Sequence, residues 1–430
     1  MIDKLYSIFQ AHPLICTDTR NILPDSLFFA LKGTNFNGNK FAQEALNAGS
    51  AYAIIDEPEF HVGDRTILVE NVLVALQELA THHRKQLKIP VIGITGSNGK
   101  TTTKELMHAV LSQKYRCYAT EGNFNNHIGV PLTLLKINSS VEIAIIEMGA
   151  NHIGEIGFLC NISQPDYSIV TNIGAAHLEG FGSIEGVIKT KKALYDYVRE
   201  HQGIAFVNRD NDLLMELAEG IEQQTFGTTS EATYQGKLVG DSFCLNVQWK
   251  TDTGFIDVPS NLVGDYNLEN ALAAMAIGSY FGVSSEAIKT AISSYVPANN
   301  RSQLIQSDTG ATIVLDAYNA NPTSMKAAIH NFTKKDSAAS VLILGDMLEL
   351  GQYSANEHQE IVTLAENLGF QNVLLVGTEF AKAKKPAHFH TAPDVAAAKT
   401  FLQNEKMPAK ASILIKGSRG IRLESLVEIL

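Results

Sequence analysis

The chain has 430 residues, of which 45% are hydrophobic, and its formal net charge is −11 at pH 7. This length exceeds what one hydrophobic core usually supports, so we expect two or three domains. The negative charge and the scattered Lys and Arg residues argue against nonspecific binding to nucleic acid or to an anionic membrane surface.

The first residues, MIDKLYSIFQAHP, lack the basic start and the long apolar core of a secretory signal. No later apolar run reaches the roughly 18 residues that a membrane-spanning helix needs. We therefore expect a cytoplasmic protein without membrane insertion. The four cysteines lie far apart with no Cys-x-x-Cys spacing, which favours reduced thiols over a zinc site or a disulfide framework.

Residues 1–86 mix short apolar runs with turns, which is consistent with a small α/β domain. The apolar run from Leu27 to Leu31 ends in a loop that contains Gly33 and Gly38. We place the first domain boundary after residue 86.

From Ile89 onward, apolar strands alternate with helical segments, including IPVIGIT, GKTTTKELMHAVL, VEIAIIEMG, DYSIVTNI, a helix near 184–199 and GIAFVNRD. This alternation predicts a parallel sheet covered by helices on both faces. The stretch from about 224 to 262 is polar and strand-rich with glycine breaks, which predicts an antiparallel appendage. Two further helical stretches complete a central domain over 87–299.

A second alternating series begins near Arg301 and contains ATIVLDAY, SVLILGDM, NVLLVG and SILIKGS, each followed by a helical segment. The last of these helices is expected at LESLVEIL. The series predicts a smaller, Rossmann-like doubly wound domain over 300–430. The fold class is therefore α/β with three domains, of which the central one is the largest parallel-sheet domain.

The strongest single motif lies directly after a strand and directly before a helix, as in a phosphate-binding loop. Glycines allow backbone N–H groups to close around phosphate oxygens, Lys100 can reach the β and γ phosphates, and Thr101 can bind Mg²⁺. Ile94 stands where the general pattern has glycine, so the loop is a variant, and an ordinary glycine-rich turn is the alternative. The motif consists of Gly96, Ser97, Asn98, Gly99, Lys100, Thr101 and Thr102.

Further candidate residues follow later strands of the same domain. Glu147 ends the strand VEIAIIEMG, which places a carboxylate at the edge where open α/β sheets bind ligands, and it could hold Mg²⁺. His177 lies in the loop after DYSIVTNI. The next helix contains Lys189, Lys191 and Lys192, which could simply form a solvated helical face.

Five segments taken together resemble the Mur ligase family: GITGSNGKTTT, EGNFNNHIGVPLTLL, IAIIEMGANHIGEI, TNIGAAHLEGFGSIEGVIKTKKALY and GDYNLENALAAMA. The resemblance implies ATP and two Mg²⁺ ions. Lys100 and Thr101 would bind phosphate and one ion with Glu147, and His177 would help to bind the second. Lys191 matches the lysine that is carbamylated by CO₂ in this family, and a carbamate, unlike an ammonium, can bind a hard cation.

The resemblance also implies roles for polar residues outside these metal positions. Asn267 and Asn270 match asparagines near the adenine, although Tyr266 stands where the family commonly has His. Arg301 would contact phosphate and Asp316 a ribose hydroxyl, whereas a salt bridge is the alternative for Arg301. The expected substrate contacts in the central and C-terminal domains are Asn126, Asn319, Asn321, Lys416 and Ser418. Turn-stabilising hydrogen bonds are the alternative for the asparagines.

The N-terminal segment resembles the nucleotide-sugar-binding domain of the subfamily that adds a terminal dipeptide. The residues that carry this likeness and the expected contacts are Thr19, Arg20, Phe28 and Lys32. Asn37-Gly38-Asn39 departs from the frequent Asp-Gly-His of that subfamily, and Phe28 could equally be a core residue.

The activity implied is an ATP-dependent amide ligase that joins D-alanyl-D-alanine to UDP-N-acetylmuramoyl-tripeptide through an acyl phosphate. We expect a monomer whose domains close around the substrates. Two alternatives stay open: a ligase of another Mur type or of the folylpolyglutamate type with a different acceptor, and a nucleotide-dependent switch without ligation.

Overall fold

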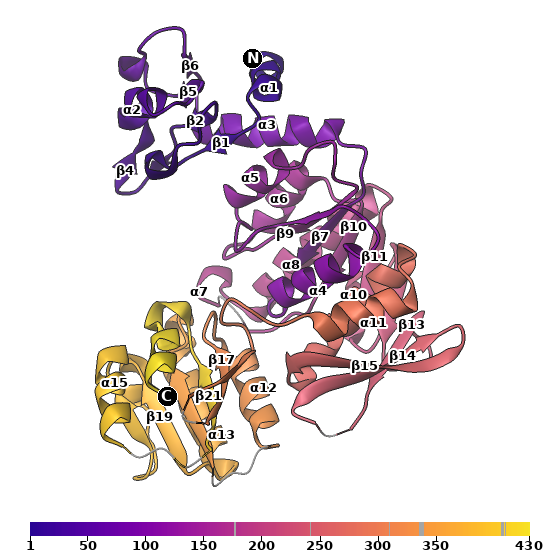
Figure 1. Cartoon of the computed structure of the whole chain (residues 1–430), viewed down its shortest axis with the longest axis vertical. Helices are drawn as coiled ribbons and strands as arrows, with labels where there is room; N and C mark the ends of the chain where they lie inside the picture. Colours follow the sequence, from indigo (N-terminus) through magenta and orange to yellow (C-terminus); the bar gives the residue numbers. More distant parts are fainter. Residues whose placement is uncertain (176–177, 241, 309, 335–338, 406–407, 409) are drawn as a thin grey trace.

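The computed structural model describes residues 1–175, 178–240, 242–308, 310–334, 339–405, 408 and 410–430. Within these residues, sheets of four, nine and six strands follow one another along the chain. They form a curved molecule with the N-terminal sheet at one end and the C-terminal sheet at the other (Figure 1). The predicted α/β class is confirmed. None of the described helices is long and apolar enough to cross a membrane.

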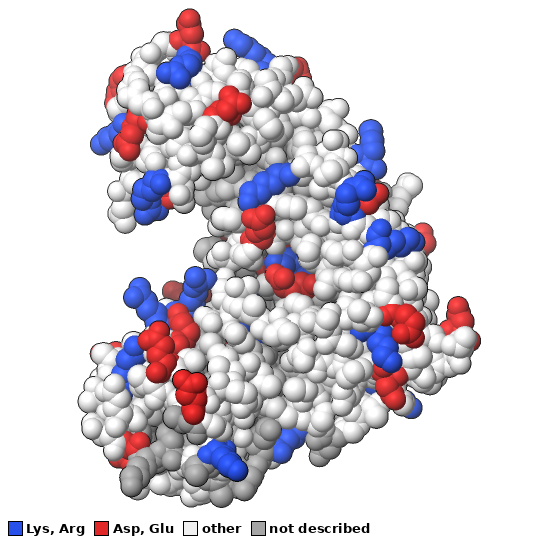
Figure 2. Space-filling model, in the orientation of Figure 1, with Lys and Arg blue, Asp and Glu red and all other residues white. Residues whose placement is uncertain are grey.

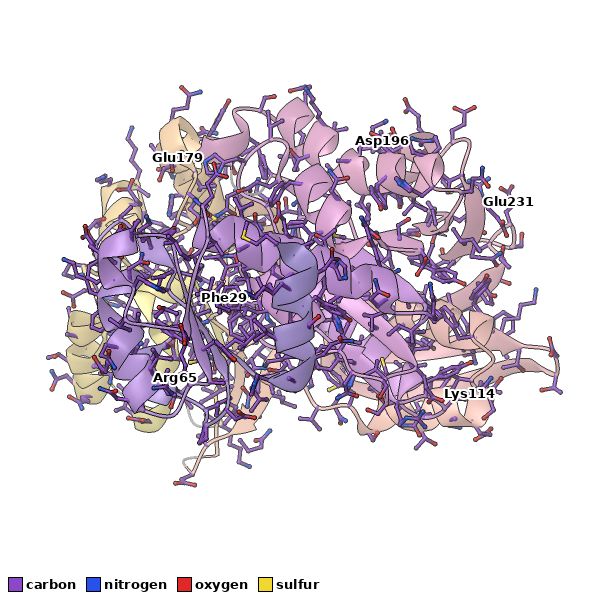
Figure 3. All side chains as sticks on the ribbon, turned by 90° about the horizontal axis from the view of Figure 1, so that it is seen from above. Phe29, Arg65, Lys114, Glu179, Asp196 and Glu231 are labelled. Atoms are coloured by element: carbon purple, nitrogen blue, oxygen red, sulfur yellow. The ribbon has the colours of Figure 1, made fainter. Side chains whose placement is uncertain are left out.

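The N-terminal sheet is parallel, in the order β1-β2-β5-β6, and its second strand is completely buried. Phe29 lies among packed side chains, whereas Glu231 lies at the edge of this view (Figure 3). Arg65 and Glu231 are both exposed. The elements are α1 (Ile2–Ala11), β1 (Ile15–Cys16), η1 (Thr19–Asn21), β2 (Leu27–Phe29), the hairpin β3 (Lys32–Gly33) and β4 (Phe36–Asn37), η2 (Gly38–Phe41), α2 (Ala42–Asn47), β5 (Tyr52–Ile55), η3 (Pro58–Phe60) and β6 (Thr66–Leu68).

Helix α3 (Val72–Gln86) connects the first sheet to the central one. Asn71 caps its first turn by accepting a hydrogen bond from the backbone N–H of Val74. The helix packs against α5 (Gly129–Leu135) and α6 (Glu155–Ser163). A single apolar cluster therefore extends from the first sheet into the central sheet.

The central sheet has the order β15-β14-β13-β12-β11-β10-β7-β9-β8 and is parallel from β13 to β8. Its strands are β7 (Val91–Thr95), β8 (Cys117–Ala119), β9 (Ile143–Glu147), β10 (Tyr167–Val170), β11 (Ile204–Asn208), β12 (Glu222–Gly227), β13 (Tyr234–Leu238), β14 (Cys244–Thr251) and β15 (Gly254–Val263). The expected appendage at 224–262 is antiparallel only from β13 onward. The appendage extends the main sheet, because β13 pairs in parallel with β12 and the antiparallel strands β14 and β15 follow.

Helices cover both faces of this sheet, as predicted. Alternate side chains along each strand separate the two cores, since Val91 packs on one face and Ile92 on the other. The first face carries α5, α6 and α8 (Ile184–Glu200), and the second carries α4 (Lys100–Leu111), α10 (Leu268–Tyr280) and α11 (Ser285–Ser294). Shorter helices are α7 (Leu178–Phe181), α9 (Asp212–Leu217) and η4 (Asp265–Asn267).

The C-terminal sheet has the order β16-β17-β21-β18-β19-β20, and only β16 is antiparallel to its neighbour. Its elements are β16 (Gln303–Gln306), β17 (Thr312–Asp316), α12 (Pro322–Phe332), β18 (Ser340–Gly345), η5 (Gly351–Tyr353), α13 (Ser354–Asn367), β19 (Asn372–Val376), α14 (Thr378–Lys382), β20 (His390–Ala392), α15 (Val395–Asn404), β21 (Ser412–Lys416), η6 (Arg419–Ile421) and η7 (Leu423–Ile429). The last segment, which was expected to be helical, is a 3₁₀-helix. Its apolar residues Leu423, Leu426 and Ile429 recur every third position and therefore share one face of a 3₁₀-helix.

Candidate active site

The phosphate-binding motif forms the loop between β7 and α4. Gly96 and Gly99 have positive φ angles of 145° and 79°. A Cβ atom at Gly96 would lie 1.9 Å from Thr171 Oγ1, and one at Gly99 would lie 2.4 Å from Asn270 Oδ1. Both positions therefore need glycine for conformation and for space.

The loop is held in place by the segment that follows β10. Asn172 Oδ1 accepts a hydrogen bond from the Asn98 N–H at 2.9 Å, and Thr171 Oγ1 donates to the Asn98 carbonyl at 2.6 Å. Ser97 Oγ lies 3.0 Å from both the N–H and the carbonyl oxygen of Gly174. Sequence reasoning did not single out Thr171 and Asn172, because their role depends on β10 lying beside β7.

Lys100 folds back onto its own loop. Its Nζ donates to the Gly96 carbonyl at 2.7 Å and to the Ser97 carbonyl at 3.3 Å. Burial lowers the pKa of Lys100, the carboxylate of Glu147 opposes this shift, and Arg301 adds to it. The ammonium group therefore occupies the mouth of the loop and is available to exchange these carbonyl contacts for an anion.

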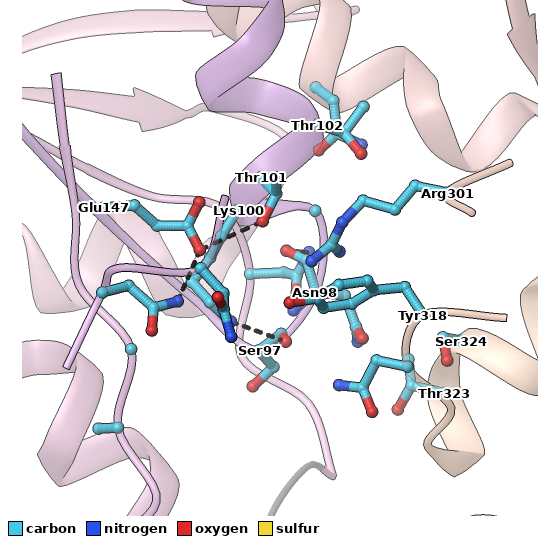
Figure 4. Close-up of a pocket in the computed structure, with 18 of the residues that line it drawn as sticks. Ser97, Asn98, Lys100, Thr101, Thr102, Glu147, Arg301, Tyr318, Thr323 and Ser324 are labelled. Atoms are coloured by element: carbon cyan, nitrogen blue, oxygen red, sulfur yellow. Dashed lines mark hydrogen bonds between the residues drawn. The ribbon is translucent and has the colours of Figure 1, made fainter. Parts of the chain in front are cut away.

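Glu147 ends β9 at the floor of the site and is 1% exposed. Its Oε1 accepts hydrogen bonds from Thr101 Oγ1 at 3.2 Å and from Asn125 Nδ2 at 2.8 Å (Figure 4). Its Oε2 is buried and has no hydrogen-bond partner among the described residues. A buried carboxylate oxygen without a partner, next to a threonine hydroxyl, fits a small divalent cation.

No cluster of three or more His, Cys, Asp or Glu side chains suited to a metal occurs in the described part of the chain. His177, the predicted contributor to a second metal site, lies outside the described residues. Glu147 with Thr101 is thus the described pair that fits Mg²⁺, which commonly binds through one or two protein oxygens together with phosphate.

Lys191 differs from the two neighbouring lysines of α8. Its side chain is 2% exposed, and its Nζ lies 5.5 Å from the centroid of the Phe181 ring. Burial is the main cause that holds the pKa of Lys191 well below its usual range, and the positive charge of Lys100 contributes. Lys189 is exposed and Lys192 pairs with Asp196, so only these two fit a solvated helical face.

The C-terminal domain contributes a cluster of charged and aromatic side chains. The guanidinium carbon of Arg301 lies 3.8 Å from the centroid of the Tyr318 ring, and both side chains face the phosphate loop (Figure 4). Lys416 Nζ donates to Asp316 Oδ2 at 2.5 Å and to the Asn319 carbonyl at 3.3 Å. Sequence reasoning had paired neither Lys416 with Asp316 nor Arg301 with Tyr318.

The two domains enclose one cavity of about 750 Å³. A hydrogen bond of 2.7 Å from Asn321 Nδ2 to Asn98 Oδ1 crosses from the C-terminal domain to the loop. Of the residues predicted from the sequence, the following line this cavity: Ser97, Asn98, Gly99, Lys100, Thr101, Thr102, Asn126, Glu147, Asn267, Asn270, Arg301, Asp316, Asn319 and Lys416. The structure therefore brings together residues from two domains that are far apart in sequence.

Several of the predicted asparagines already make hydrogen bonds within the protein. Asn270 Oδ1 accepts from Thr103 Oγ1 at 3.0 Å, and its Nδ2 donates to Asn267 Oδ1 at 2.9 Å. Asn126 Oδ1 accepts from the N–H groups of Ile128 and Gly129 at the start of α5. These residues stabilise the wall of the cavity, and Asn125 is the asparagine of this segment that contacts Glu147.

The predicted contacts of the N-terminal domain lie away from this cavity. Phe28 is 2% exposed and packs in the apolar core between the first sheet and α2. This position agrees with the alternative that Phe28 is a core residue. Lys32 Nζ lies 3.0 Å from Asp56 Oδ1 and 3.3 Å from Glu57 Oε1. Arg20 is paired with Asp18, whose pKa falls to about 2 because of that contact, and Thr19 is in the same short helix.

Ser418 also lies outside the residues that line the cavity. Its hydroxyl accepts a hydrogen bond of 3.0 Å from the N–H of Leu348 and thereby links the ends of β21 and β18. The side chain is 5% exposed. Its position is structural support for the loop that follows Lys416.

The fold and the cavity define a P-loop nucleotide-binding enzyme assembled from separate domains, and sequence comparison identifies its class. Residues 94–278 match the Mur ligase middle domain, residues 300–419 match the Mur ligase glutamate ligase domain, and residues 14–91 match the Mur ligase family catalytic domain. The chain belongs to the Mur ligase family of ATP-dependent ligases.

Similar proteins cover almost the whole chain. It is 37% identical to the UDP-N-acetylmuramoyl-tripeptide–D-alanyl-D-alanine ligase of Bacillus subtilis (strain 168), covering 96% of this chain and 92% of the relative. The ligase of the same name from Escherichia coli (strain K12) is 35% identical, with 97% and 93% covered.

Solved structures agree with these sequence relatives. A crystal structure of MurF from Acinetobacter baumannii has a TM-score of 0.87 at 31% identity and covers 98% of this chain and 97% of that one. MurF from Thermotoga maritima in complex with ADP has a TM-score of 0.85 at 27% identity, with 97% and 96% covered. A folylpolyglutamate synthase from Mycobacterium tuberculosis, at 16% identity and a TM-score of 0.64, shares the fold alone.

Proposed function

We infer that this chain joins D-alanyl-D-alanine to UDP-N-acetylmuramoyl-tripeptide in peptidoglycan precursor synthesis, with conversion of ATP to ADP and phosphate. The observation that carries the inference is similarity along nearly the full length to ligases with this activity, at up to 37% identity among the relatives above. The proposal is supported by the cavity between the central and C-terminal domains, which is lined by Lys100, Thr101, Glu147 and Arg301.

The reaction begins when the carboxylate of the tripeptide attacks the γ-phosphate of ATP. The bond from the γ-phosphorus to the bridging oxygen breaks, ADP leaves and an acyl phosphate is formed. Backbone N–H groups of the loop at 96–102 and the ammonium of Lys100 hold the phosphates, and Arg301 stabilises negative charge as it moves. The amine of the dipeptide then attacks the acyl carbon, and the tetrahedral intermediate collapses with loss of phosphate. Positioning and electrostatics account for this chemistry without a protein nucleophile.

The metal sites are part of the proposal. Thr101 and Glu147 would hold one Mg²⁺, which the unpartnered Glu147 Oε2 supports, and His177 and carbamylated Lys191 would help to hold a second. Bound Mg²⁺ would neutralise the crowded phosphate oxygens.

Carbamylation of Lys191 is supported by its burial and its lowered pKa. A neutral amine is the form that reacts with CO₂, and a lowered pKa increases the share of this form at a given pH. Removal of CO₂ should lower the rate of phosphate release, and added bicarbonate should restore it. A rate that does not respond to CO₂ would contradict this modification.

The remaining assignments are proposals drawn from the family resemblance. We propose that Asn267, Asn270 and Asp316 lie against the adenosine of ATP. The proposed substrate contacts are Thr19, Arg20, Lys32, Asn126, Asn319, Asn321 and Lys416. Phe28 and Ser418, which the resemblance also implied as contacts, are buried and would act only as support for these surfaces. We further propose domains at 1–86, 87–299 and 300–430, a monomeric state, and a cytoplasmic location, where ATP and the nucleotide-linked precursor are available.

The proposal is tested by phosphate release from ATP and Mg²⁺ in the presence of UDP-N-acetylmuramoyl-tripeptide. D-alanyl-D-alanine is compared with single amino acids and with glutamate as acceptors, and the product mass is determined. Release and the corresponding mass with the dipeptide alone are expected. Activity with another acceptor would place the chain in a sister ligase group, and ATP binding without release with any acceptor would favour a nucleotide switch.

A further inference from the structure

Asn125 lies in the loop between β8 and α5 and faces the cavity beneath the phosphate loop. Its Nδ2 donates a hydrogen bond of 2.8 Å to Glu147 Oε1. Thr101 Oγ1 donates to the same oxygen at 3.2 Å, whereas Oε2 of this carboxylate is buried without a partner among the described residues. The two donors thus occupy one oxygen and leave the other unoccupied.

The position of the Asn125 amide is fixed from both sides. The backbone carbonyl of Asn125 accepts a hydrogen bond of 2.8 Å from the N–H of Gly149, which lies two residues after Glu147. A Cβ atom at Gly149 would lie 2.9 Å from Asn125 Cγ, so the amide rests directly on the glycine backbone. Glu147 is fixed as well, because its N–H donates to Thr120 Oγ1 at 2.9 Å.

The chemistry of an amide suits this contact. A carboxylate oxygen only accepts hydrogen bonds, so the amide must present its NH₂ group to Glu147. This neutral donor restrains the rotation of the carboxylate and leaves its negative charge intact. A lysine or arginine in the same place would neutralise that charge and would compete with a cation.

We propose that Asn125 is a positioning residue that holds Glu147 Oε1 and thereby directs Oε2 into the cavity to bind the divalent cation. The inference rests on the metal site of the proposed function and adds the residue that orients its carboxylate. Partners of this kind, one shell outside the metal, commonly change metal affinity by about 10- to 100-fold when they are replaced.

The test compares the affinity for ADP in EDTA with that in Mn²⁺, measured by calorimetry on the full chain without turnover. The ratio of the two affinities reports the contribution of the metal. In Asn125→Leu, which has a similar shape but no donor, the affinity in EDTA should stay within about twofold of the parent. The ratio of ADP affinity in Mn²⁺ to that in EDTA, called the Mn²⁺ ratio below, should fall about tenfold. It should approach the ratio of Glu147→Gln, the variant that removes the carboxylate itself.

A second variant keeps the amide and disturbs its support. Gly149→Ala would push the Asn125 side chain away from its present position, so it should also lower the Mn²⁺ ratio. Asn404→Leu, at an exposed position on α15, is the matched control and should leave both affinities unchanged.

An unchanged Mn²⁺ ratio in Asn125→Leu would overturn the inference. Equal losses of ADP affinity in EDTA and in Mn²⁺ would also overturn it, because they would show that Asn125 only shapes the loop. If the parent protein binds ADP equally well with and without Mn²⁺, the result contradicts the metal site of the proposed function itself, and the role of Asn125 falls with it.

Discussion

At the scale of single residues, Lys100 illustrates how the site is arranged before a nucleotide binds. The contacts of its ammonium group with the Gly96 and Ser97 carbonyls keep the positive charge at the mouth of the loop. Phosphate oxygens carry more negative charge than these carbonyls, so ATP should draw the lysine away from them. The same side chain would then stabilise the γ-phosphate as its charge is redistributed.

Lys100→Met should reduce phosphate release by at least about 100-fold, because it removes a charge that stabilises the transition state. The measurement is the rate of release at saturating tripeptide and dipeptide substrates. Lys4→Met, at an exposed position in α1, is the control and should retain the parent rate. A Lys100→Met protein with more than a tenth of the parent rate would contradict the assigned role.

Lys191 should make stability depend on pH. Its folded-state pKa lies well below the ordinary value, so between these two values the unfolded chain binds more protons than the folded protein. The free energy of unfolding therefore rises with pH through this interval as far as Lys191 contributes. Below the folded-state pKa of Lys191, the folded and the unfolded states both bind the proton. The free-energy cost of burying the charged ammonium group then has its full value.

Lys191→Met should accordingly stabilise the fold at pH 7, by about 1 kcal/mol, because it removes a buried ionisable group. The gain should shrink toward pH 10. Urea unfolding in CO₂-free buffer at both pH values measures it, with the exposed Lys189→Met as control. A gain that grows with pH would show that the sign of the pKa shift is wrong.

At the scale of secondary structure, the packing of α10 on α4 sets the position of the asparagines beside the phosphate loop. Gly278 lets the helices approach, since a Cβ atom there would lie 2.3 Å from Val110 Cγ1. The approach brings Asn270, in the first turn of α10, against Gly99 at the start of α4. Gly278, near the C-terminal end of α10, thus influences where Asn270 lies at the N-terminal end of that helix.

Gly278→Leu should destabilise the protein by about 2 kcal/mol through overpacking and should weaken ADP binding as the helices move apart. Chemical unfolding and calorimetry provide the two measurements. Gly157→Ala in α6 is the matched control, because its Cβ would meet only Ala193 at 3.8 Å. It should leave ADP affinity unchanged and gain up to about 1 kcal/mol. Equal behaviour of the two variants would refute the packing argument.

At the scale of the whole molecule, the N-terminal and C-terminal domains lie on either side of a broad hollow (Figure 2). Contacts between the central and C-terminal domains include Lys334 with Asp265 at 2.7 Å and the Tyr266 hydroxyl with Ser302 at 3.0 Å. The N-terminal domain, which contains the proposed substrate contacts Thr19, Arg20 and Lys32, lies across this hollow from the C-terminal domain. A substrate that reaches both ends must bring the outer domains closer together.

We expect the radius of gyration from small-angle X-ray scattering to fall when a non-hydrolysable ATP analogue and the tripeptide substrate are added together. The physical reason is that the proposed substrate contacts come from all three domains, so that closure would be needed to complete them. The tripeptide substrate alone, without the nucleotide, serves as the control. Superimposable profiles with and without both ligands would rule out an open resting form.

The sequence alone determined the features that depend on local pattern. Alternating apolar strands and helices predicted the parallel sheets, because burial on both faces requires nearly continuous apolar runs. The order Gly99-Lys100-Thr101 after a strand predicted the phosphate loop. The family resemblance singled out Lys191 among the three lysines of its helix, and the structure buries Lys191 where Lys189 is exposed.

Tertiary structure alone decided the contacts between segments that are distant in sequence. Asn125 and not Asn126 reaches Glu147, although 22 residues separate the pair. Asn98 meets Asn321 over 223 residues, and Lys416 meets Asp316 over 100. Local periodicity carries no information on which strands become neighbours or how closely two domains approach, and these two choices placed the side chains of the site.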